Sequence, residues 1–344
     1  MALSNKLRNL PLLVLLAAFL GGCAAVQDSA STGQKSAAGA RADGERFESA
    51  DYIVVIAKSG DTPASLAASY LSDASKSWMI EDFNGTSAFS PGDQVVIPKH
   101  YWNLSGVTAD GYQLVPVLCY HNLAPQSKGR MILGAKVFEE QMRYLKNQGY
   151  RVINLKEFIE FVSLKRQLPN KSILLTFDDG YRSFLPYAYP ILKELGFTAT
   201  LFIYTDYVGA GGNAFTWADL KKLSQEGFDV EAHSKSHGDM VRAKGEAAGE
   251  YDKRLDTELA QPRLLFQKNL GFVPDILAYP YGRQDEAVVR RTKERGYAAA
   301  FTVRRQGSPS FVDPLRIHRS QIYPEMSMDD FVKNLNTFAR ENNK

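Results

Sequence analysis

The chain has 344 residues, 44% hydrophobic and 23% charged, which is typical of a globular protein with a large apolar core. These values exclude a disordered chain, a collagen-like chain and a membrane protein with several spanning helices. A formal net charge of +3, without a dense basic run, gives no indication of a nucleic-acid partner. Two cysteines exclude a disulfide scaffold and a cysteine-rich zinc site.

Residues 1–22 are predicted to be a targeting segment. Two basic residues precede an apolar run over 10–20, which is too short to span a bilayer as a helix. The run ends in Leu-Gly-Gly before Cys23, and this ending resembles the signal of bacterial lipoproteins. The resemblance implies a lipidated Cys23 that holds the protein on the extracytoplasmic side of a membrane in the bacterial cell envelope. The alternative is an ordinary secretory signal with a chance cysteine.

The segments that follow predict a tether and then a small βααβ domain. Residues 23–50 are rich in Ala, Ser, Gly and charged residues and show no apolar periodicity, which indicates a flexible tether. Residues 51–99 contain two β-rich runs around two short helices, the first capped by Thr62 with Pro63 at its first position.

This small domain resembles the LysM domain. The matching residues are Tyr52, Gly60-Asp61-Thr62, Leu66-Ala67, Phe83-Asn84, Pro91-Gly92 and Ile97-Pro98. LysM domains bind chains of N-acetylglucosamine, so the resemblance implies a glycan partner. A small structural unit that binds nothing is the alternative. Residues 100–111 are predicted to be a linker.

Residues 112–344 predict an α/β domain with repeated strand–helix units. Six short apolar runs are suited to buried parallel strands: 114–119, 173–177, 199–204, 228–232, 276–278 and 298–303. Glycine followed by an aromatic residue ends five of the amphipathic stretches, as expected where a helix stops before a strand. The length fits a distorted (β/α) barrel. A doubly wound open sheet is the alternative, although no glycine-rich nucleotide loop follows the first strand.

Polar residues follow four of the predicted strands, at the end where barrel enzymes build their sites. They are His121, Asp178 with Asp179, His233, and Tyr279-Pro280-Tyr281. His233 and His237 are four residues apart and can share a metal if the segment is helical. Two adjacent acids after a buried strand are costly unless they are used. One carboxylate can therefore complete a metal site with the histidines, and the other is a candidate base.

These residues resemble the polysaccharide deacetylases of carbohydrate esterase family 4. The matching motifs are Thr176-Phe177-Asp178-Asp179-Gly180, His233-Ser-x-x-His237 and the Pro280-Tyr281 pair. Val117-Leu118-Cys119-Tyr120-His121 resembles the start of the branch that includes poly-N-acetylglucosamine deacetylases.

The family resemblance implies a role for each matched residue. Asp179, His233 and His237 would hold a divalent metal, which the resemblance implies to be zinc, and Asp178 would be the base. The backbone near Tyr281, together with Tyr279, is assigned to the substrate and the oxyanion.

Two positions depart from the family pattern. Ala278 replaces the arginine that often orients the base. Arg283, Arg316 or Arg319 is therefore expected to supply that charge, and Arg283 and Arg319 are the main candidates for this role. The usual late Leu-x-His acid is not reproduced around His318, so His121 is the preferred acid and His318 the alternative.

The predicted function is removal of N-acetyl groups from an N-acetylglucosamine polymer, with release of acetate. A non-catalytic glycan-binding protein and an O-acetyl esterase are the alternatives. The LysM-like unit favours peptidoglycan as the substrate, whereas the variant motifs around His121 and Tyr281 favour an exopolysaccharide. The sequence indicates no protein partner.

Overall fold

The computed structural model of the protein describes residues 46–341. The predicted signal segment, Cys23 and most of the predicted tether lie outside the described residues. Within the described range, none of the helices combines the length and apolar character needed to cross a membrane.

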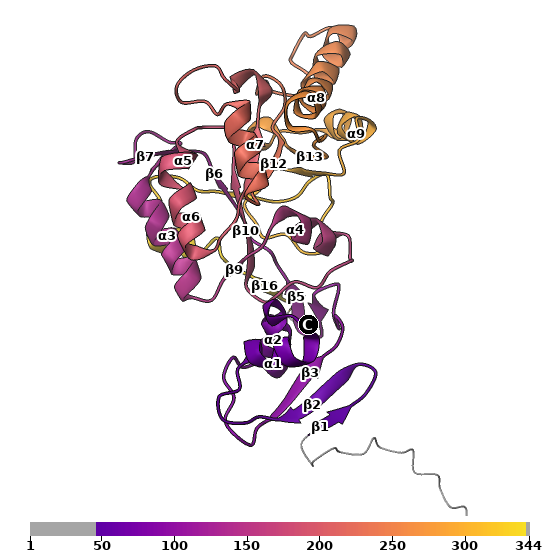
Figure 1. The fold of residues 1–344 in the computed structure, drawn as a ribbon. Helices are drawn as coiled ribbons and strands as arrows, with labels where there is room; N and C mark the ends of the chain where they lie inside the picture. The colour runs from indigo at the N-terminus through magenta and orange to yellow at the C-terminus, as the bar shows by residue number, and fades with distance from the viewer. Residues whose placement is uncertain (1–45, 342–344) are drawn as a thin grey trace, which may run out of the picture. The chain divides into compact units, whose positions relative to one another are not determined.

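The N-terminal module is a three-stranded antiparallel sheet in the order β1-β2-β3, with two helices (Figure 1). Its elements are β1 (Arg46–Glu48), β2 (Tyr52–Ile56), α1 (Pro63–Leu71), the 3₁₀ turn η2 (Ala74–Lys76), α2 (Ser77–Asn84) and β3 (Gln94–Pro98). Thr62 caps α1 as expected, because its side chain accepts a hydrogen bond from the Ser65 amide. β1 lies within the segment predicted to be a tether and pairs with β2, so regular structure begins earlier than predicted.

The frame of the larger domain is a parallel sheet in the order β14-β13-β12-β11-β10-β6-β15, with β9 paired to β10. The strands are β6 (Val117–Tyr120), β9 (Arg151–Val152), β10 (Ser172–Phe177), β11 (Thr200–Ile203), β12 (Asp229–Ala232), β13 (Ile276–Ala278), β14 (Ala299–Phe301) and β15 (Ser320–Gln321). All six predicted strands are present, with ends shifted by a few residues.

The sheet curls until its two edges approach each other. A parallel bridge between Phe301 and Ile317 joins β14 to the segment that leads into β15 at the opposite edge. The predicted distorted (β/α) barrel is therefore confirmed, and the sheet is not the open, doubly wound alternative.

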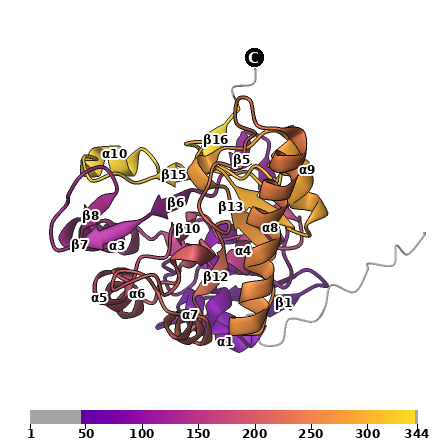
Figure 2. The same cartoon turned by 90° about the horizontal axis from the view of Figure 1, so that it is seen from above.

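Helices cover the outside of the curled sheet. They are α3 (Ala135–Asn147), α4 (Leu155–Val162), α5 (Phe184–Tyr187), α6 (Tyr189–Leu195), α7 (Trp217–Gln225), α8 (Ala248–Leu270), α9 (Glu286–Glu294) and α10 (Met328–Val332). α8 lies beside α9, and α3 beside α6, in both views (Figures 1 and 2). The five predicted junction glycines all have positive φ, which is the left-handed conformation that ends a helix.

Smaller elements complete the domain. They are an antiparallel sheet of β4 (Val107–Thr108), β5 (Gly111–Gln113) and β16 (Phe338–Arg340), a parallel pair of β7 (Asn122–Ala124) and β8 (Ile132–Gly134), and the 3₁₀ turns η3 (Thr205–Tyr207) and η4 (Pro280–Gly282).

The interior of the barrel is filled by aromatic side chains and one arginine. Phe202 and Phe301 lie 5.4 Å apart between ring centroids, and Phe158 of α4 lies 5.8 Å from Phe301. Arg319 is the largest fully buried side chain among the described residues. A guanidinium in such an interior requires a buried anionic partner.

Candidate metal centre and active site

The predicted polar residues converge because their strands are neighbours with aligned ends. Phe177 of β10 pairs with Tyr120 of β6, and Ala232 of β12 pairs with Leu277 of β13. The residues that follow these strands therefore meet at one edge of the barrel.

Asp179, His233 and His237 form a set of ligand atoms that fits a divalent cation. The Oδ1 atom of Asp179 lies 3.5 Å from Nε2 of His233 and 3.2 Å from Nε2 of His237. This Oδ1 atom is buried and has no hydrogen-bond partner among the described residues. Nδ1 of His233 lies 2.7 Å from the carbonyl oxygen of Ala278. In the tautomer protonated on Nδ1, this N–H group donates a hydrogen bond to the Ala278 carbonyl, and the lone pair of Nε2 is directed at the site.

The charge states of these groups favour cation binding. Burial, followed by the neighbouring charge of Asp178, raises the pKa of Asp179 to about 7. Burial lowers the pKa of His233 to about 3 and also lowers that of His237. At neutral pH both imidazoles are therefore uncharged, and a cation would supply the positive charge that stabilises ionised Asp179.

The two histidines meet without the helical turn that the sequence analysis gave as the condition for sharing a metal. Residues 233–237 form a loop in which Ser234 and His237 have φ values of 73° and 61°. The Ser234 hydroxyl accepts a hydrogen bond from the His237 amide, and the Glu258 carboxylate accepts from the Lys235 and Ser236 amides. These bonds stabilise a turn that brings the imidazole centroids to 4.8 Å.

Backbone strain is concentrated at this site. Seven non-glycine residues in the described range have positive φ, and four of them are Asp179, Ser234, His237 and Tyr281. Left-handed conformations cost energy for residues with a Cβ atom and persist where surrounding contacts impose them. The contacts around these residues therefore hold the candidate ligands in one arrangement despite the strain.

Asp178 forms a buried, bidentate ion pair with Arg319. The guanidinium donates to Oδ1 and Oδ2 of Asp178 at 2.7 and 2.8 Å, to the Thr302 carbonyl at 3.0 Å and to Thr176 Oγ1 at 3.2 Å. Burial opposes ionisation of Asp178, but the charge and hydrogen bonds of Arg319 outweigh it and hold its pKa well below the usual range. Asp178 is thus ionised beside the candidate cation site.

Of the arginines considered from the sequence, only Arg319 contacts Asp178. Arg283 pairs with Asp239, and Arg316 pairs with Asp313 and Glu286. Arg319 immediately precedes β15 and points into the barrel, whereas the other two side chains are partly exposed.

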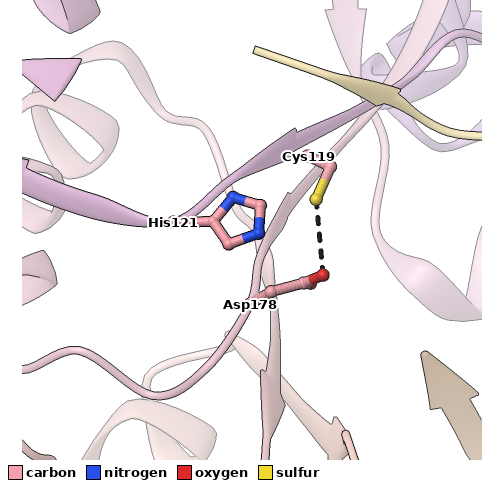
Figure 3. A group of neighbouring side chains, drawn as sticks. All are labelled: Cys119, His121 and Asp178. Atoms are coloured by element: carbon pink, nitrogen blue, oxygen red, sulfur yellow. Dashed lines mark hydrogen bonds between the residues drawn. The ribbon is translucent and has the colours of Figure 1, made fainter. Parts of the chain in front are cut away.

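His121 lies beside Asp178, and so does Cys119 (Figure 3). The Cys119 thiol donates to Oδ2 of Asp178 at 3.4 Å. Candidate ligand atoms of Cys119, His121 and Asp178 all lie within 4.8 Å of one another. Sequence reasoning missed Cys119, although its position two residues before His121 on a strand places both on one face.

The two candidate acids differ in their surroundings. Burial lowers the pKa of His121 to about 4, so its imidazole is neutral at pH 7. His318 makes its hydrogen bonds with Gly307 and Ser308. Of the two histidines, His121 is the one that lies with Asp178.

The two tyrosines that the family resemblance assigns to the substrate and the oxyanion divide between site and core. Tyr281 is 57% exposed, and its ring centroid lies 4.7 Å from that of His237. Tyr279 is fully buried and its hydroxyl donates to the Leu315 carbonyl, so it does not present a surface to a substrate.

A known protein family matches the segment of the chain that carries most of the candidate site residues. Residues 165–300 match the polysaccharide deacetylase family. This range contains Asp178, Asp179, His233, His237 and Tyr281, and it begins after His121. The resemblance to polysaccharide deacetylases predicted from the sequence is confirmed over these residues.

Similar sequences include proteins described as deacetylases. The chain is 27% identical over 217 residues to YxkH of Bacillus subtilis, a predicted polysaccharide deacetylase, covering 63% of this chain and 74% of that protein. It is 26% identical over 190 residues to the poly-beta-1,6-N-acetyl-D-glucosamine N-deacetylase of Staphylococcus epidermidis, covering 53% of this chain. The match spans 65% of the S. epidermidis enzyme, which is less than two thirds of its length.

Solved structures share the fold. The Streptococcus pyogenes deacetylase PplD, solved in complex with acetate, superposes with a TM-score of 0.59 at 24% identity, covering 66% of this chain and 99% of that one. IcaB from Ammonifex degensii superposes with a TM-score of 0.58 at 24% identity, covering 66% and 97%.

The two adjacent acids are expected to respond differently to replacement by asparagine. Asp179→Asn removes a ligand and is expected to abolish metal binding. Asp178→Asn is expected to retain the metal but lose activity by about a hundred- to ten-thousand-fold, as for removal of a general base. Metal content by mass spectrometry and acetate release check both variants. Loss of metal from Asp178→Asn alone would reverse the assignment.

Arg319 is expected to control the ionisation of Asp178. A depressed pKa means that the ionised pair stabilises the fold above the unfolded-state pKa, and that this stability is lost as pH falls through the folded-state pKa. Arg319→Met leaves a buried carboxylate unpaired and is expected to lower stability at pH 7 by about 3–5 kcal/mol. Burial then raises the pKa of Asp178, so the acid limb of the activity profile moves to higher pH.

Urea unfolding and the pH dependence of kcat/KM test this expectation. Arg316→Met is the matched control, because its carboxylate partners are partly exposed and such pairs contribute about 1 kcal/mol or less. Arg319→Lys retains a charge without the bidentate geometry, and it provides the pH profile if Arg319→Met does not fold. An unchanged acid limb in these variants would contradict the role of Arg319.

Proposed function

We propose that the protein is a metal-dependent hydrolase that removes N-acetyl groups from an N-acetylglucosamine-containing polysaccharide and releases acetate. The observation that carries this proposal is the unpartnered Oδ1 atom of Asp179, directed at two neutral imidazoles beside an ionised Asp178. Two imidazoles and one carboxylate form a ligand set typical of catalytic zinc sites, so Zn²⁺ is the proposed cation.

The proposed reaction uses the residues around that site. A divalent cation held by Asp179, His233 and His237 would supply Lewis acidity, which would polarise an acetamide carbonyl and make a water easier to deprotonate. Asp178 accepts the proton of the attacking water, and Arg319 keeps the Asp178 carboxylate oriented. The exposed Tyr281 ring lies beside His237, where it would cover one side of an acetamide bound at this site.

His121 is the proposed proton donor to the leaving amine. An amine is a poor leaving group unless it is protonated as the C–N bond breaks. Because His121 is neutral in the resting protein, it must first receive a proton. Its proximity to Asp178 allows the proton removed from water to pass through His121 to the amine.

Two alternatives to N-deacetylation are weighed against the same observations. A non-catalytic glycan-binding protein has no need of an ionised, oriented Asp178 beside a cation site. An O-acetyl esterase uses the same groups but depends less on His121, because an alcohol leaves more easily than an amine. The names of the staphylococcal relatives favour poly-β-1,6-N-acetylglucosamine as the substrate class, whereas the LysM-like unit favours peptidoglycan.

Acetate release from matched glycans tests the proposal. The wild-type protein is expected to release acetate from N-acetylglucosamine oligomers, and to lose this activity on chelation and regain it with Zn²⁺. His121→Ala is expected to reduce deacetylation about a hundredfold, and hydrolysis of an activated acetate ester much less. His318→Ala is the matched control. Release from O-acetylated glycans only would establish the esterase instead, and an amide-selective loss in His318→Ala would transfer the acid role to His318.

The proposed location is the bacterial cell envelope, with lipid on Cys23 and glycan contact through the N-terminal module. Both rest on resemblances of the sequence to lipoprotein signals and LysM domains. Together they would hold the hydrolase near an extracytoplasmic polymer.

Replacement of Cys23 tests the anchor. Cys23→Ala removes the thiol that would be acylated, so the protein is expected to move from the membrane fraction to the soluble fraction. Cys119→Ala is the control, since this buried thiol lies in the barrel. Radiolabelled fatty acid and fractionation are the measurements, and acylated Cys23→Ala protein in membranes would contradict the anchor.

A further inference from the structure

A second ligand set, formed by Cys119, His121 and Asp178, lies inside the same edge of the barrel (Figure 3). Its three donors are a thiol sulfur, an imidazole nitrogen and a carboxylate oxygen, and they all lie within 4.8 Å of one another. Cys119 belongs to β6 and His121 directly follows that strand, whereas Asp178 directly follows β10, the neighbour of β6 in the sheet. The register of two buried strands therefore sets the spacing of the three side chains.

The separation of the sulfur and oxygen atoms fits a tetrahedral metal ion. The Cys119 thiol donates to Oδ2 of Asp178, and the two heavy atoms lie 3.4 Å apart. Metal bonds of about 2.3 Å to sulfur and about 2.1 Å to oxygen span this separation with an angle of about 100° at the metal. This angle is close to that of a tetrahedral site. A cation that replaces the thiol proton can therefore bind both atoms with little movement of the side chains.

The ion pair with Arg319 is compatible with a cation in this position. The guanidinium donates to Oδ1 and Oδ2 of Asp178 at 2.7 and 2.8 Å. Because a carboxylate oxygen has two lone pairs, Oδ2 accepts from Arg319 with one and from the thiol with the other. A cation in place of the thiol proton leaves both arginine bonds intact. Thiolate and carboxylate then carry two negative charges against the single charge of Arg319, and the excess attracts a cation.

The donor types make the second ligand set selective for cations that bind sulfur. Burial raises the pKa of the Cys119 thiol well above its usual range, so a cation must displace the thiol proton. Zn²⁺ and Co²⁺ form strong bonds to thiolate sulfur, whereas Mg²⁺ prefers oxygen ligands. Burial lowers the pKa of His121 to about 4, so its neutral imidazole has one nitrogen free to bind.

The second ligand set lies next to Asp179, His233 and His237, the first ligand set, and shares no residue with it. Oδ2 of Asp178 is 3.7 Å from Nε2 of His233, so cations in both sets would repel each other. The first set fills more readily, because Oδ1 of Asp179 has no hydrogen-bond partner in the described part of the chain, whereas the second must release a thiol proton. A second cation would therefore bind only when the metal is in excess.

We propose that Cys119, His121 and Asp178 form a second, inhibitory site for a divalent cation that binds sulfur, such as Zn²⁺ in excess. On binding, the S–H bond breaks, the proton passes to water and the sulfur electron pair forms the bond to the metal. The inhibition rests on the proposed function, because the cation takes the lone pairs that Asp178 needs as the base and His121 as the acid. The binding of the cation does not depend on that function.

Cobalt absorption tests the site directly. The chain has two cysteines, so the full-length Cys23→Ala protein retains Cys119 as its single thiol. When the metal-free protein is titrated with Co²⁺, a thiolate-to-cobalt charge-transfer band in the near ultraviolet is expected with the second equivalent. Cys119→Ser in the same background is expected to lose the band and to bind one Co²⁺ per chain. Asp179→Asn is expected to keep the band, because it changes only the first ligand set.

His318→Ala is the matched control, because His318 makes its hydrogen bonds with Gly307 and Ser308. It is expected to leave both the band and the binding of two Co²⁺ unchanged. One retained Co²⁺ shows that Cys119→Ser is folded, and Cys119→Ala replaces it if it is not. The absence of the band at saturating Co²⁺ in the Cys23→Ala protein, or an equal band in Cys119→Ser, would overturn the site.

Activity measurements test the inhibition and separate it from the proposed function. Acetate release by the wild-type protein is expected to rise with the first equivalent of Zn²⁺ and to fall in excess Zn²⁺, but not in excess Mg²⁺. Cys119→Ser is expected to keep the rise and lose the fall. An equal fall in both proteins would overturn the inhibitory role. A cobalt band without acetate release at any Zn²⁺ concentration would reject the proposed function and still support the second cation site.

Discussion

The ion pair between Arg319 and Asp178 is the interaction on which the rest of the site depends. Both side chains are buried, and the guanidinium lies over the rings of Phe202 and Phe301 at 5.4 and 5.9 Å. Neither charge is stable in this interior alone, because desolvation costs several kcal/mol per ion. Paired through two hydrogen bonds, they remain ionised in one geometry. The barrel thereby holds a carboxylate, with its orientation and charge already set, beneath its catalytic edge.

The pair also explains how two adjacent carboxyl groups acquire different roles. Asp178 has a lowered pKa because Arg319 compensates for its burial, whereas Asp179 has a raised pKa because burial and Asp178 act on it together. Asp179 therefore requires a second positive charge, and His233 and His237 place ligand atoms where a cation would provide it. Opposed pKa shifts in neighbouring groups are typical of catalytic sites. One acid is suited to accept a proton and the other to bind the cation.

The loops that carry the candidate acid and base also line a groove of about 410 Å³. The loop after β10 begins with Asp178 and Asp179 and continues through Tyr181 to Arg182 in the groove wall. The loop after β6 begins with His121 and continues into the opposite wall. Under the proposed function, each loop would carry both a reactive group and a surface for the sugar chain, so the position of a bound chain would be coupled to the position of its acetamide. Such coupling is how binding away from the reacting bond contributes to catalysis.

The sequence by itself determined the fold class, the six main strands and the set of candidate residues, because apolar runs and helix-ending glycines report local structure directly. It also grouped His121, Asp178, Asp179, His233 and Tyr281, since parallel strands end at a common edge. Only the tertiary structure selected Arg319 over Arg283 and Arg316 and buried Tyr279. It also brought Cys119 to Asp178 and showed that a strained loop, not a helical turn, brings His233 and His237 together. These features depend on side-chain direction and on contacts between distant residues, such as Asp178 and Arg319, which are 141 positions apart. No local pattern encodes such contacts, because desolvation and charge pairing arise only when the barrel closes around them.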